Sequence, residues 1–453
     1  MNTILLSDSY KVTHWKQYPQ GTTNVYSYFE SRGGQFKDTT FFGLQYIMDR
    51  YLTHPVTMAD IDEAEELYSQ HFGMDLFNRA GWEHIVNTHD GLLPVKIKAV
   101  PEGTVVPTHN ILMSIENTDP KVPWITNFLE TILSQVWYPS TVATLSGATR
   151  KLIRSYLVRT GDPSLIDFKL HDFGFRGATT VEAAGIGGCA HLVNFLGTDT
   201  VPAMVTARDH YGATSAAGFS VPASEHSTMT SWGREHEVDA YRNMIKEYGG
   251  SPFYSVVSDS YDLFKAAREI WGDTLRSRVL GAGGTLVVRP DSGTPSVIVP
   301  QLLQALGEKF GWSVNSNNYR VLNPKVRVIQ GDGMDYNSIE ATLSSMAVQG
   351  WSADNVTFGM GGGLLQRVNR DTQKFAFKCS SAVVNGEQRD VFKDPATDKG
   401  KVSKKGRLGL SAEMKTVHEN ANEVLETVFR DGRIVKRYTL DEVRANARAS
   451  SDR

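Results

Sequence analysis

The chain has 453 residues, more than a single hydrophobic core usually organises, so we expect two structural units. Hydrophobic residues make up 40% and charged residues 21%, a globular composition that excludes a disordered chain. The formal net charge of −3 provides no global field for nucleic acid, so an anionic substrate must be held by locally placed arginine and lysine.

The two cysteines, Cys189 and Cys379, have no metal-binding spacing, so we expect neither a zinc site nor a disulfide framework. Two free thiols suit a reducing compartment. The N-terminus lacks a basic leader, and no segment approaches the roughly 18 apolar residues of a membrane span. These features predict a cytoplasmic protein with no membrane or nucleic-acid partner.

The first third of the chain mixes strand and helix patterns. Residues 25–29 alternate as a strand does, residues 60–72 have helical spacing before the stop signal Gly73, and residues 93–106 are β-rich. A further helix is expected from Pro123 to Tyr138, broken by Pro139, and another from about 140 to 159.

After residue 165, short β-prone runs recur, each followed by polar or glycine residues and most then by a helical pattern such as 261–270 or 338–349. This order predicts a (β/α) barrel with its chemistry on the loops that follow the strands. A doubly wound open sheet gives the same local pattern; the barrel is favoured because every strand end carries a polar cluster. The runs are 167–170, 218–221, 254–257, 285–288, 326–329 and 355–358.

The glycine run Gly359-Met360-Gly361-Gly362-Gly363 lies between a predicted strand and a helix. Glycines let backbone N–H groups approach an anion, and a helix N-terminus favours negative charge, so this junction predicts phosphate binding. A plain flexible turn is the alternative.

Two other strand ends carry charge. Arg289 offers a planar fork to phosphate oxygens, and Asp291 can accept a ribose hydroxyl or join a magnesium shell; a surface ion pair on a turn is the alternative. Asp332, between Gly331 and Gly333, suits ribose binding, whereas a tight turn explains it equally simply.

The segment after residue 170 combines Phe173 with Arg176, a stacking face beside a cation for a phosphorylated aromatic ligand, although a lone phenylalanine is more often core. His226 lies on another predicted strand end, where a lone histidine is more often structural than catalytic. Residues 185–190 fit a dinucleotide fingerprint formally, but the helical pattern of 179–184 before them excludes it. The basic residues of 399–407 are expected in a solvated loop; the alternative is a lid over a phosphorylated substrate.

Taken together, these motifs resemble the nicotinamide phosphoribosyltransferase family over nearly the whole chain, from Ile4 to about residue 445. The motifs that carry the resemblance, in chain order, are 8–14 (DSYKVTH), 171–177 (HDFGFRG), 197–200 (GTDT), 220–227 (SVPASEHS), 257–262 (VSDSYD), 289–293 (RPDSG), 330–333 (QGDG) and 361–366 (GGGLLQ).

The resemblance implies an irregular (β/α) barrel of the type II phosphoribosyltransferase kind, packed on an α+β domain built from both chain ends. In this picture residues 1–165 and 369–453 form the α+β domain and residues 166–368 form the barrel with the active face. It also implies a homodimer with shared active sites.

The resemblance further implies that nicotinamide lies between Phe173 and Tyr10 of the partner subunit, with its carboxamide donating to Asp199. The remaining substrate-binding residues that it implies are Asp8 and Ser220, Arg176 and Arg289 for the diphosphate, Asp291, Gly331 and Asp332 for the ribose, and Gly361, Gly362, Arg370 and Lys378 for the 5′-phosphate.

The reaction so implied transfers phosphoribosyl from 5-phosphoribosyl 1-diphosphate to nicotinamide in NAD synthesis, through a transition state stabilised mainly by positioning and electrostatics. His226, Asp259 and Asp291 are the implied catalytic residues, with His226 phosphorylated by ATP. Mg²⁺ would act through the diphosphate, with Asp259 and Asp332 as candidate ligands. Two rivals remain open: a nicotinate phosphoribosyltransferase and a non-catalytic sensor of pyridine nucleotides.

Overall fold

The computed structural model describes residues 1–397 and 401–451, which divide into two compact units. The first comprises 1–144, 207–214 and 369–453, and the second comprises 145–206 and 215–368. Residues 145–165, assigned from sequence to the N-terminal domain, are grouped here with the barrel. No helix of the described chain is long and apolar enough to cross a membrane.

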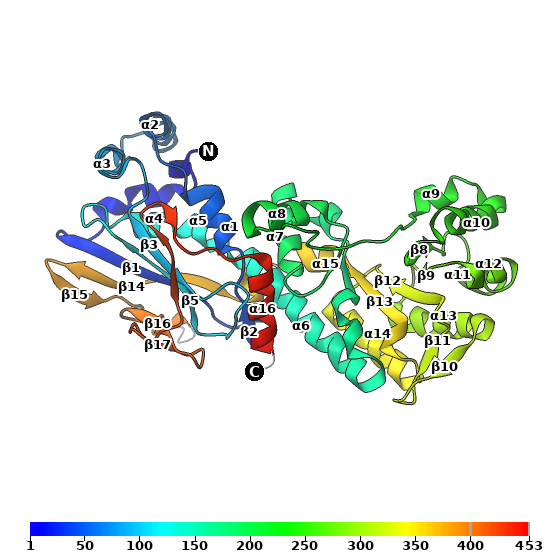
Figure 1. Ribbon diagram of the computed structural model, residues 1–453. Coiled ribbons are helices and arrows are strands. Elements are labelled where there is room, and N and C mark those ends of the chain that lie inside the picture. Colours follow the sequence, from blue (N-terminus) through cyan, green and yellow to red (C-terminus); the bar gives the residue numbers. More distant parts are fainter. Residues whose placement is uncertain (398–400, 452–453) are drawn as a thin grey trace. The chain divides into compact units, whose positions relative to one another are not determined.

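The first unit is built on a seven-stranded antiparallel sheet in the order β15-β14-β1-β5-β3-β18-β19 (Figure 1). Both chain ends supply strands, which confirms the predicted α+β domain. The strands are β1 (Thr22–Ser31), β3 (Val95–Ala99), β5 (Ile111–Asn117), β14 (Phe375–Val384), β15 (Glu387–Asp390), β18 (Glu426–Arg430) and β19 (Arg433–Ile434), with two small pairs, β2 (Asp38–Thr40) with β4 (Val105–Pro107) and β16 (Leu408–Leu410) with β17 (Thr416–His418).

Helices cover this sheet, and α2 packs beside α3. The α2 helix begins at a Thr57–Asp60 capping box and ends at Gly73 in the left-handed region, as predicted. The helices are α1 (Leu44–Ile47), α2 (Met58–Phe72), α3 (Arg79–His89), α4 (Ile125–Phe128), α5 (Glu130–Ser134) and α16 (Leu440–Ser451), and α6 (Trp137–Thr160) begins in this unit. The predicted break at Pro139 is wrong, because Pro139 lies in the first turn of α6, where a backbone N–H has no intrahelical partner to lose.

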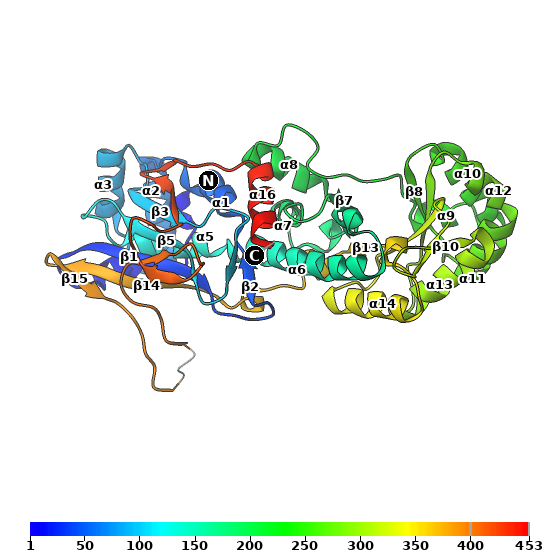
Figure 2. The same cartoon turned by 60° about the horizontal axis from the view of Figure 1, so that its bottom comes forward.

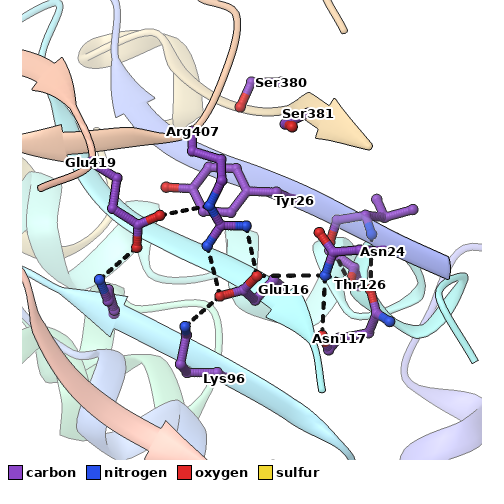
Figure 3. A network of polar contacts seen from close by, with 12 residues as sticks. Asn24, Tyr26, Lys96, Glu116, Asn117, Thr126, Ser380, Ser381, Arg407 and Glu419 are labelled. Carbon is purple, nitrogen blue, oxygen red and sulfur yellow. Dashed lines mark hydrogen bonds and ion pairs between the residues drawn. The ribbon is translucent and has the colours of Figure 1, made fainter. Parts of the chain in front are cut away.

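A partly buried ion network joins the C-terminal segment to the sheet (Figure 3). Both terminal nitrogens of Arg407 donate hydrogen bonds to the Glu116 carboxylate, at 2.8 and 2.9 Å, and its Nε donates one to Glu419 at 2.6 Å. Its guanidinium also lies 4.7 Å from the Tyr26 ring centroid. Arg407 is therefore anchored and does not belong to a solvated loop; Lys399, of the same predicted loop, lies outside the described residues.

The second unit contains a parallel six-stranded sheet in the order β7-β6-β13-β12-β9-β8. Extended residues 219–223 bridge the two edges: Phe219 pairs in parallel with Gly197 of β7, and Ala223 with Ser255 of β8. The ring is thereby closed as an irregular barrel, which confirms the predicted fold class. The strands are β6 (Leu170–Asp172), β7 (Gly197–Thr198), β8 (Phe253–Val257), β9 (Thr285–Arg289), β12 (Val326–Gln330) and β13 (Val356–Met360), with an outer pair of β10 (Trp312–Val314) and β11 (Arg320–Leu322).

Helices pack outside these strands (Figures 1 and 2). Predicted helix 338–349 corresponds to α14, whereas 261–270 is a short α-turn continued by a π-helical stretch, Ala266–Thr274. The glycines of 185–190 lie inside α7, which confirms the rejection of a dinucleotide site. The helices are α7 (Val181–His191), α8 (Val201–Tyr211), α9 (His226–Thr230), α10 (Glu237–Tyr248), α11 (Leu263–Lys265), α12 (Arg276–Gly281), α13 (Pro295–Phe310), α14 (Tyr336–Val348) and α15 (Gly362–Leu365).

Candidate active site

Parallel register brings the predicted side chains to one end of the barrel. Val257 of β8 pairs with Arg289 of β9, so Asp259 and Asp291, each two residues further on, leave the sheet side by side. Asp172 of β6 likewise pairs with Thr198 of β7, so Phe173 and Asp199 follow neighbouring strand ends.

The strand ends surround a cavity of about 680 Å³. Ten of the predicted residues line it: Phe173, Arg176, Asp199, His226, Arg289, Asp291, Gly331, Asp332, Gly361 and Gly362. Ser220 and Asp259 contact this set from the next layer, since Ser220 donates to Asp199 and Asp259 accepts from the backbone N–H of Asp291. A cavity lined by two phenylalanines, three arginines, four carboxylates and a glycine run suits a flat ring joined to phosphorylated groups.

The ring of Phe173 is set by the glycines around it. Its backbone N–H donates to Met360 O at 3.0 Å, which holds it against β13. A Cβ on Gly331 would lie 3.1 Å from Phe173 Cε2, and one on Gly359 would come well under 3.0 Å from the same ring. Only glycine at 359 therefore permits this ring position. Beneath it, buried Asp172 accepts the Gly174 N–H at 2.7 Å and fixes the turn.

Asp199 is held as an ionised acceptor. Its Oδ1 accepts Ser220 Oγ at 2.5 Å and lies 2.9 Å from His171 Nε2. Burial alone would raise the pKa of Asp199, but the hydrogen bonds from His171 and Ser220 and the positive charge of Arg289 lower it below its ordinary value. Its side chain remains 45% exposed, so a carboxylate oxygen stays available to a ligand in the cavity.

His226 lies beside two carboxylates, those of Asp259 and Asp291. It begins α9, and its Nε2 lies 3.4 Å from Asp259 Oδ1 and 3.5 Å from Asp291 Oδ2. Ser260 Oγ lies 3.2 Å from Nδ1, so both ring nitrogens have polar neighbours. Asp259 is positioned in turn by the N–H of Asp291 at 2.8 Å and by Ser292 Oγ at 2.5 Å.

Orphaned polar atoms also point to a charged ligand. Asp259 Oδ1 and Arg289 Nε are buried and make no hydrogen bond among the described residues; their charged neighbours, His226 Nε2 at 3.4 Å and Asp291 Oδ1 at 3.9 Å, make only longer ion-pair contacts. Buried polar atoms are normally satisfied, so an unsatisfied pair around one cavity indicates groups that a ligand completes.

The glycine run adds backbone groups to the same wall. Gly361 is the N-cap of the short helix α15, and its carbonyl accepts the N–H groups of Leu364 and Leu365. A Cβ on Gly362 would meet open space, whereas one on Gly363 would lie 2.6 Å from Met334 O. Gly362 therefore faces the cavity, and Gly363 is required for close packing.

The other four predicted residues belong to the first unit. Asp8 accepts Thr131 Oγ1 at 2.7 Å, and Tyr10 is 58% exposed. Arg370 is exposed, and half-buried Lys378 donates to its neighbour's carbonyl, Phe377 O, at 2.8 Å.

Several site residues received no individual role from the sequence. His171 supports Asp199 and Ser260 contacts His226, and both lie inside quoted motifs. Glu225, Ser227 and Arg367 line the cavity as well. Arg367 could have been predicted as a phosphate-binding residue, because it is a basic residue two positions after α15.

Comparison with known proteins identifies the family of the chain. A sequence model of the Nicotinate phosphoribosyltransferase (NAPRTase) family matches residues 168–433, and one of the Nicotinamide phosphoribosyltransferase N-terminal domain matches residues 2–97. A protein of Xanthomonas campestris pv. campestris named nicotinamide phosphoribosyltransferase is 51% identical, over 99% of this chain and 98% of its own. The chain belongs to the nicotinamide phosphoribosyltransferase family.

Other members are more distant. The protein of the same name from Acinetobacter baylyi is 34% identical, over 98% of this chain and 96% of its own. A crystal structure of nicotinate-nucleotide pyrophosphorylase from Pyrococcus furiosus has 14% identity and a TM-score of 0.62, covering 100% of this chain and 96% of that one, and so shares the fold. Family membership makes the chain an enzyme of the pentosyltransferase class and removes the non-catalytic sensor hypothesis.

Proposed function

We propose that the barrel cavity transfers the 5-phosphoribosyl group from 5-phosphoribosyl 1-diphosphate to nicotinamide, forming nicotinamide mononucleotide and diphosphate. The C1–O bond to diphosphate breaks with its electron pair on the leaving group, and the pyridine nitrogen lone pair forms the new C1–N bond. The observation that carries this choice is the ionised Asp199 near Phe173 at neighbouring strand ends.

Asp199 favours the amide over the acid. An ionised carboxylate accepts a hydrogen bond from the carboxamide NH2, whereas it repels the carboxylate of nicotinate. The phenyl ring of Phe173 offers the stacking face that a pyridine ring needs. Nicotinate phosphoribosyl transfer is therefore the second candidate, favoured only by the family model that covers the barrel.

The other residues that line the cavity suit the phosphorylated substrate. Arg176 and Arg289 would hold the diphosphate, Asp291 and Asp332 the ribose hydroxyls, and the backbone at Gly361 and Gly362 the 5′-phosphate. The transition state carries spread positive charge on the ribose, so nearby carboxylates stabilise it more than the ground state.

Magnesium fits the same wall. Asp259 presents a buried carboxylate oxygen without a hydrogen-bond partner in the described chain, and Asp332 supplies another carboxylate at the cavity; such oxygens are the donors that Mg²⁺ prefers. When bound, Mg²⁺ neutralises the leaving diphosphate. Asp259 and Asp332 would hold it with the diphosphate.

ATP coupling is part of the proposal. His226 is 42% exposed and lines the cavity, and the carboxylates of Asp259 and Asp291 lie 3.4 and 3.5 Å from its Nε2, where they orient the ring. It would accept phosphate from ATP and so couple ATP hydrolysis to product formation.

A homodimer with shared sites completes the proposal. Tyr10, exposed in the first unit, would cover the nicotinamide ring in the partner's barrel. Lys378 has a pKa lowered first by burial and further by the positive charges of Arg32, Lys393 and Arg370, a clustering of cations that suits a phosphate. Mixed dimers of Tyr10→Ala and Asp291→Ala subunits should regain activity, because one hybrid site then holds both side chains. Inactive but verified mixed dimers would contradict shared sites.

Product identification tests the function. The protein is incubated with phosphoribosyl diphosphate, Mg²⁺ and either nicotinamide or nicotinate, and the nucleotide is identified by mass. We expect nicotinamide mononucleotide and little acid product. Preferential formation of nicotinate mononucleotide would support the second candidate, and no nucleotide from either base would overturn both.

A further inference from the structure

Three side chains able to bind a metal converge in the first unit, and none of them belongs to the barrel residues that the proposed function uses. His84 and His89 lie on α3, and Asp119 follows β5. Their ligand atoms all lie within 4.8 Å of one another, and Nε2 of each histidine is 2.7 Å from Asp119 Oδ2. The side chains are 21%, 27% and 11% exposed, so the cluster is partly desolvated.

Local structure aims all three groups at one point. His84 and His89 belong to the last two turns of α3, which ends at Asp90 in the left-handed region. In the loop, the Lys121 N–H donates to Asp119 Oδ1 at 2.8 Å, and Asn117 Nδ2 donates to the Asp119 carbonyl at 2.8 Å. Oδ1 of Asp119 is thus held by a backbone N–H, and Oδ2 contacts the two histidines.

The second nitrogen of one ring is also engaged. Thr88 Oγ1 lies 3.2 Å from His84 Nδ1, an outer contact of the kind that orients a ligating imidazole. An aspartate carboxylate is charged at neutral pH and needs no deprotonation to bind a cation.

Two imidazoles and a carboxylate form a ligand set that Zn²⁺ and similar borderline cations prefer. Ligand atoms about 2.0–2.1 Å from a tetrahedral metal lie about 3.3 Å apart, so the 2.7 Å contacts must open by about half an ångström. The side chains must rotate to reach this geometry. His84 lines one cavity, of about 460 Å³, and His89 lines another, of about 410 Å³, so water can reach the remaining coordination positions.

We propose that His84, His89 and Asp119 form a divalent transition-metal site of the zinc type, which clamps α3 to the loop after β5. This site is independent of the transferase proposal. Sequence analysis could not predict this site, because two ligands five residues apart on a helix and a third thirty residues further on match no short motif.

Metal binding to the tag-free full chain tests the site. Co²⁺ is titrated as a spectroscopic probe, and Zn²⁺ is then added to displace it. We expect one Co²⁺ per chain, displaced by Zn²⁺, and at least about tenfold weaker binding in His89→Gln and in Asp119→Asn. His54→Gln, an exposed histidine of the same unit, is the matched control and should bind as the wild type does.

Thermal unfolding provides a second readout that depends on folding. Zn²⁺ at a hundredfold excess over its dissociation constant should raise the wild-type Tm by about 5 °C, and EDTA should reverse the rise. Thr88→Val, which keeps all three ligands, should fold normally yet bind Co²⁺ about tenfold more weakly. The proposal would be overturned if the wild-type protein bound no stoichiometric Co²⁺, or if folded His89→Gln protein bound Co²⁺ as the wild type does. The three residues would then only hydrogen-bond to one another.

Discussion

The ring of Phe173 lies so close to the Cα of Gly359 that no Cβ fits between them. Gly359→Ala should therefore push the ring toward the cavity at a cost of about 1–3 kcal/mol, shared between folding and ligand binding. Because the ring is the proposed stacking face, we expect the KM for nicotinamide to rise about tenfold, with a smaller change in the KM for phosphoribosyl diphosphate.

Steady-state kinetics with each substrate varied in turn checks this split. Gly281→Ala is the matched control, since a Cβ at Gly281 meets nothing within 4 Å. Equal increases in both KM values would show that Phe173 does not contact the base.

Asp199→Asn should lower kcat/KM for nicotinamide about 10- to 100-fold, because a charged hydrogen bond contributes about 1.5–3 kcal/mol. Removal of the negative charge should also improve the relative use of nicotinate. The measurement is the ratio of kcat/KM values for the two bases, with Asp273→Asn, on the barrel exterior and paired with Lys309, as the control. An unchanged ratio would remove Asp199 from base recognition.

His226→Ala should abolish both the acid-labile phosphoryl group and the substrate-stimulated ATP hydrolysis, while part of the basal condensation survives. Radiolabelled ATP and product assays with and without ATP measure these separately. His236→Ala, a histidine 66% exposed and paired with Asp239, is the control. Synthesis that ATP still enhances in a folded His226→Ala enzyme would exclude the phosphohistidine.

Glu116 gives a pH-dependent contribution to stability. Burial would raise its pKa, but Arg407 and Lys96 lower it from 4.5 to about 2. A carboxylate with a depressed folded pKa stabilises the protein above about pH 4.5, and this contribution is lost as the pH falls toward 2. Glu116→Gln should therefore cost about 2 kcal/mol at pH 7 and progressively less below pH 4.5.

Urea unfolding of wild type and variant across this pH range measures the difference. Glu66→Gln, exposed on α2, should show no such convergence. A constant difference between wild type and Glu116→Gln at all pH values would mean that packing, not charge, explains the loss.

Strands flanked by clear polar ends were predictable from sequence. β8, β9 and β12 are short β-branched runs before charged turns, and their predicted bounds agree with the structure within one residue at each end. The strand expected at 167–170 forms instead at Leu170–Asp172, because residues 163–168 adopt a 3-10 helix begun by Asp162 and Pro163. Residues 218–221 form no strand: in this range Phe219 alone makes an isolated bridge, to Gly197, a pairing that depends on a neighbour outside the segment.

The members of the site were predictable, but their mutual contacts were not. Motif resemblance supplied Asp199 and His226. The pairing of Asp199 with His171 depends on the register of β6 with β7, and that of Asp259 with Asp291 on β8 with β9. Register is set by the whole barrel, and no single segment encodes it.

The pairing of β1 with β14 has a consequence for how the chain is made. Thr22–Ser31 leaves the ribosome long before Phe375–Val384, so β1, an interior strand of the seven-stranded sheet, has one unpaired edge until most of the chain exists. The barrel, continuous from 145 to 368 apart from residues 207–214, needs no strand from beyond residue 368. During synthesis, the barrel can therefore assemble before the sheet of the first unit is complete, and the N-terminal strands of that sheet are exposed to aggregation for longer.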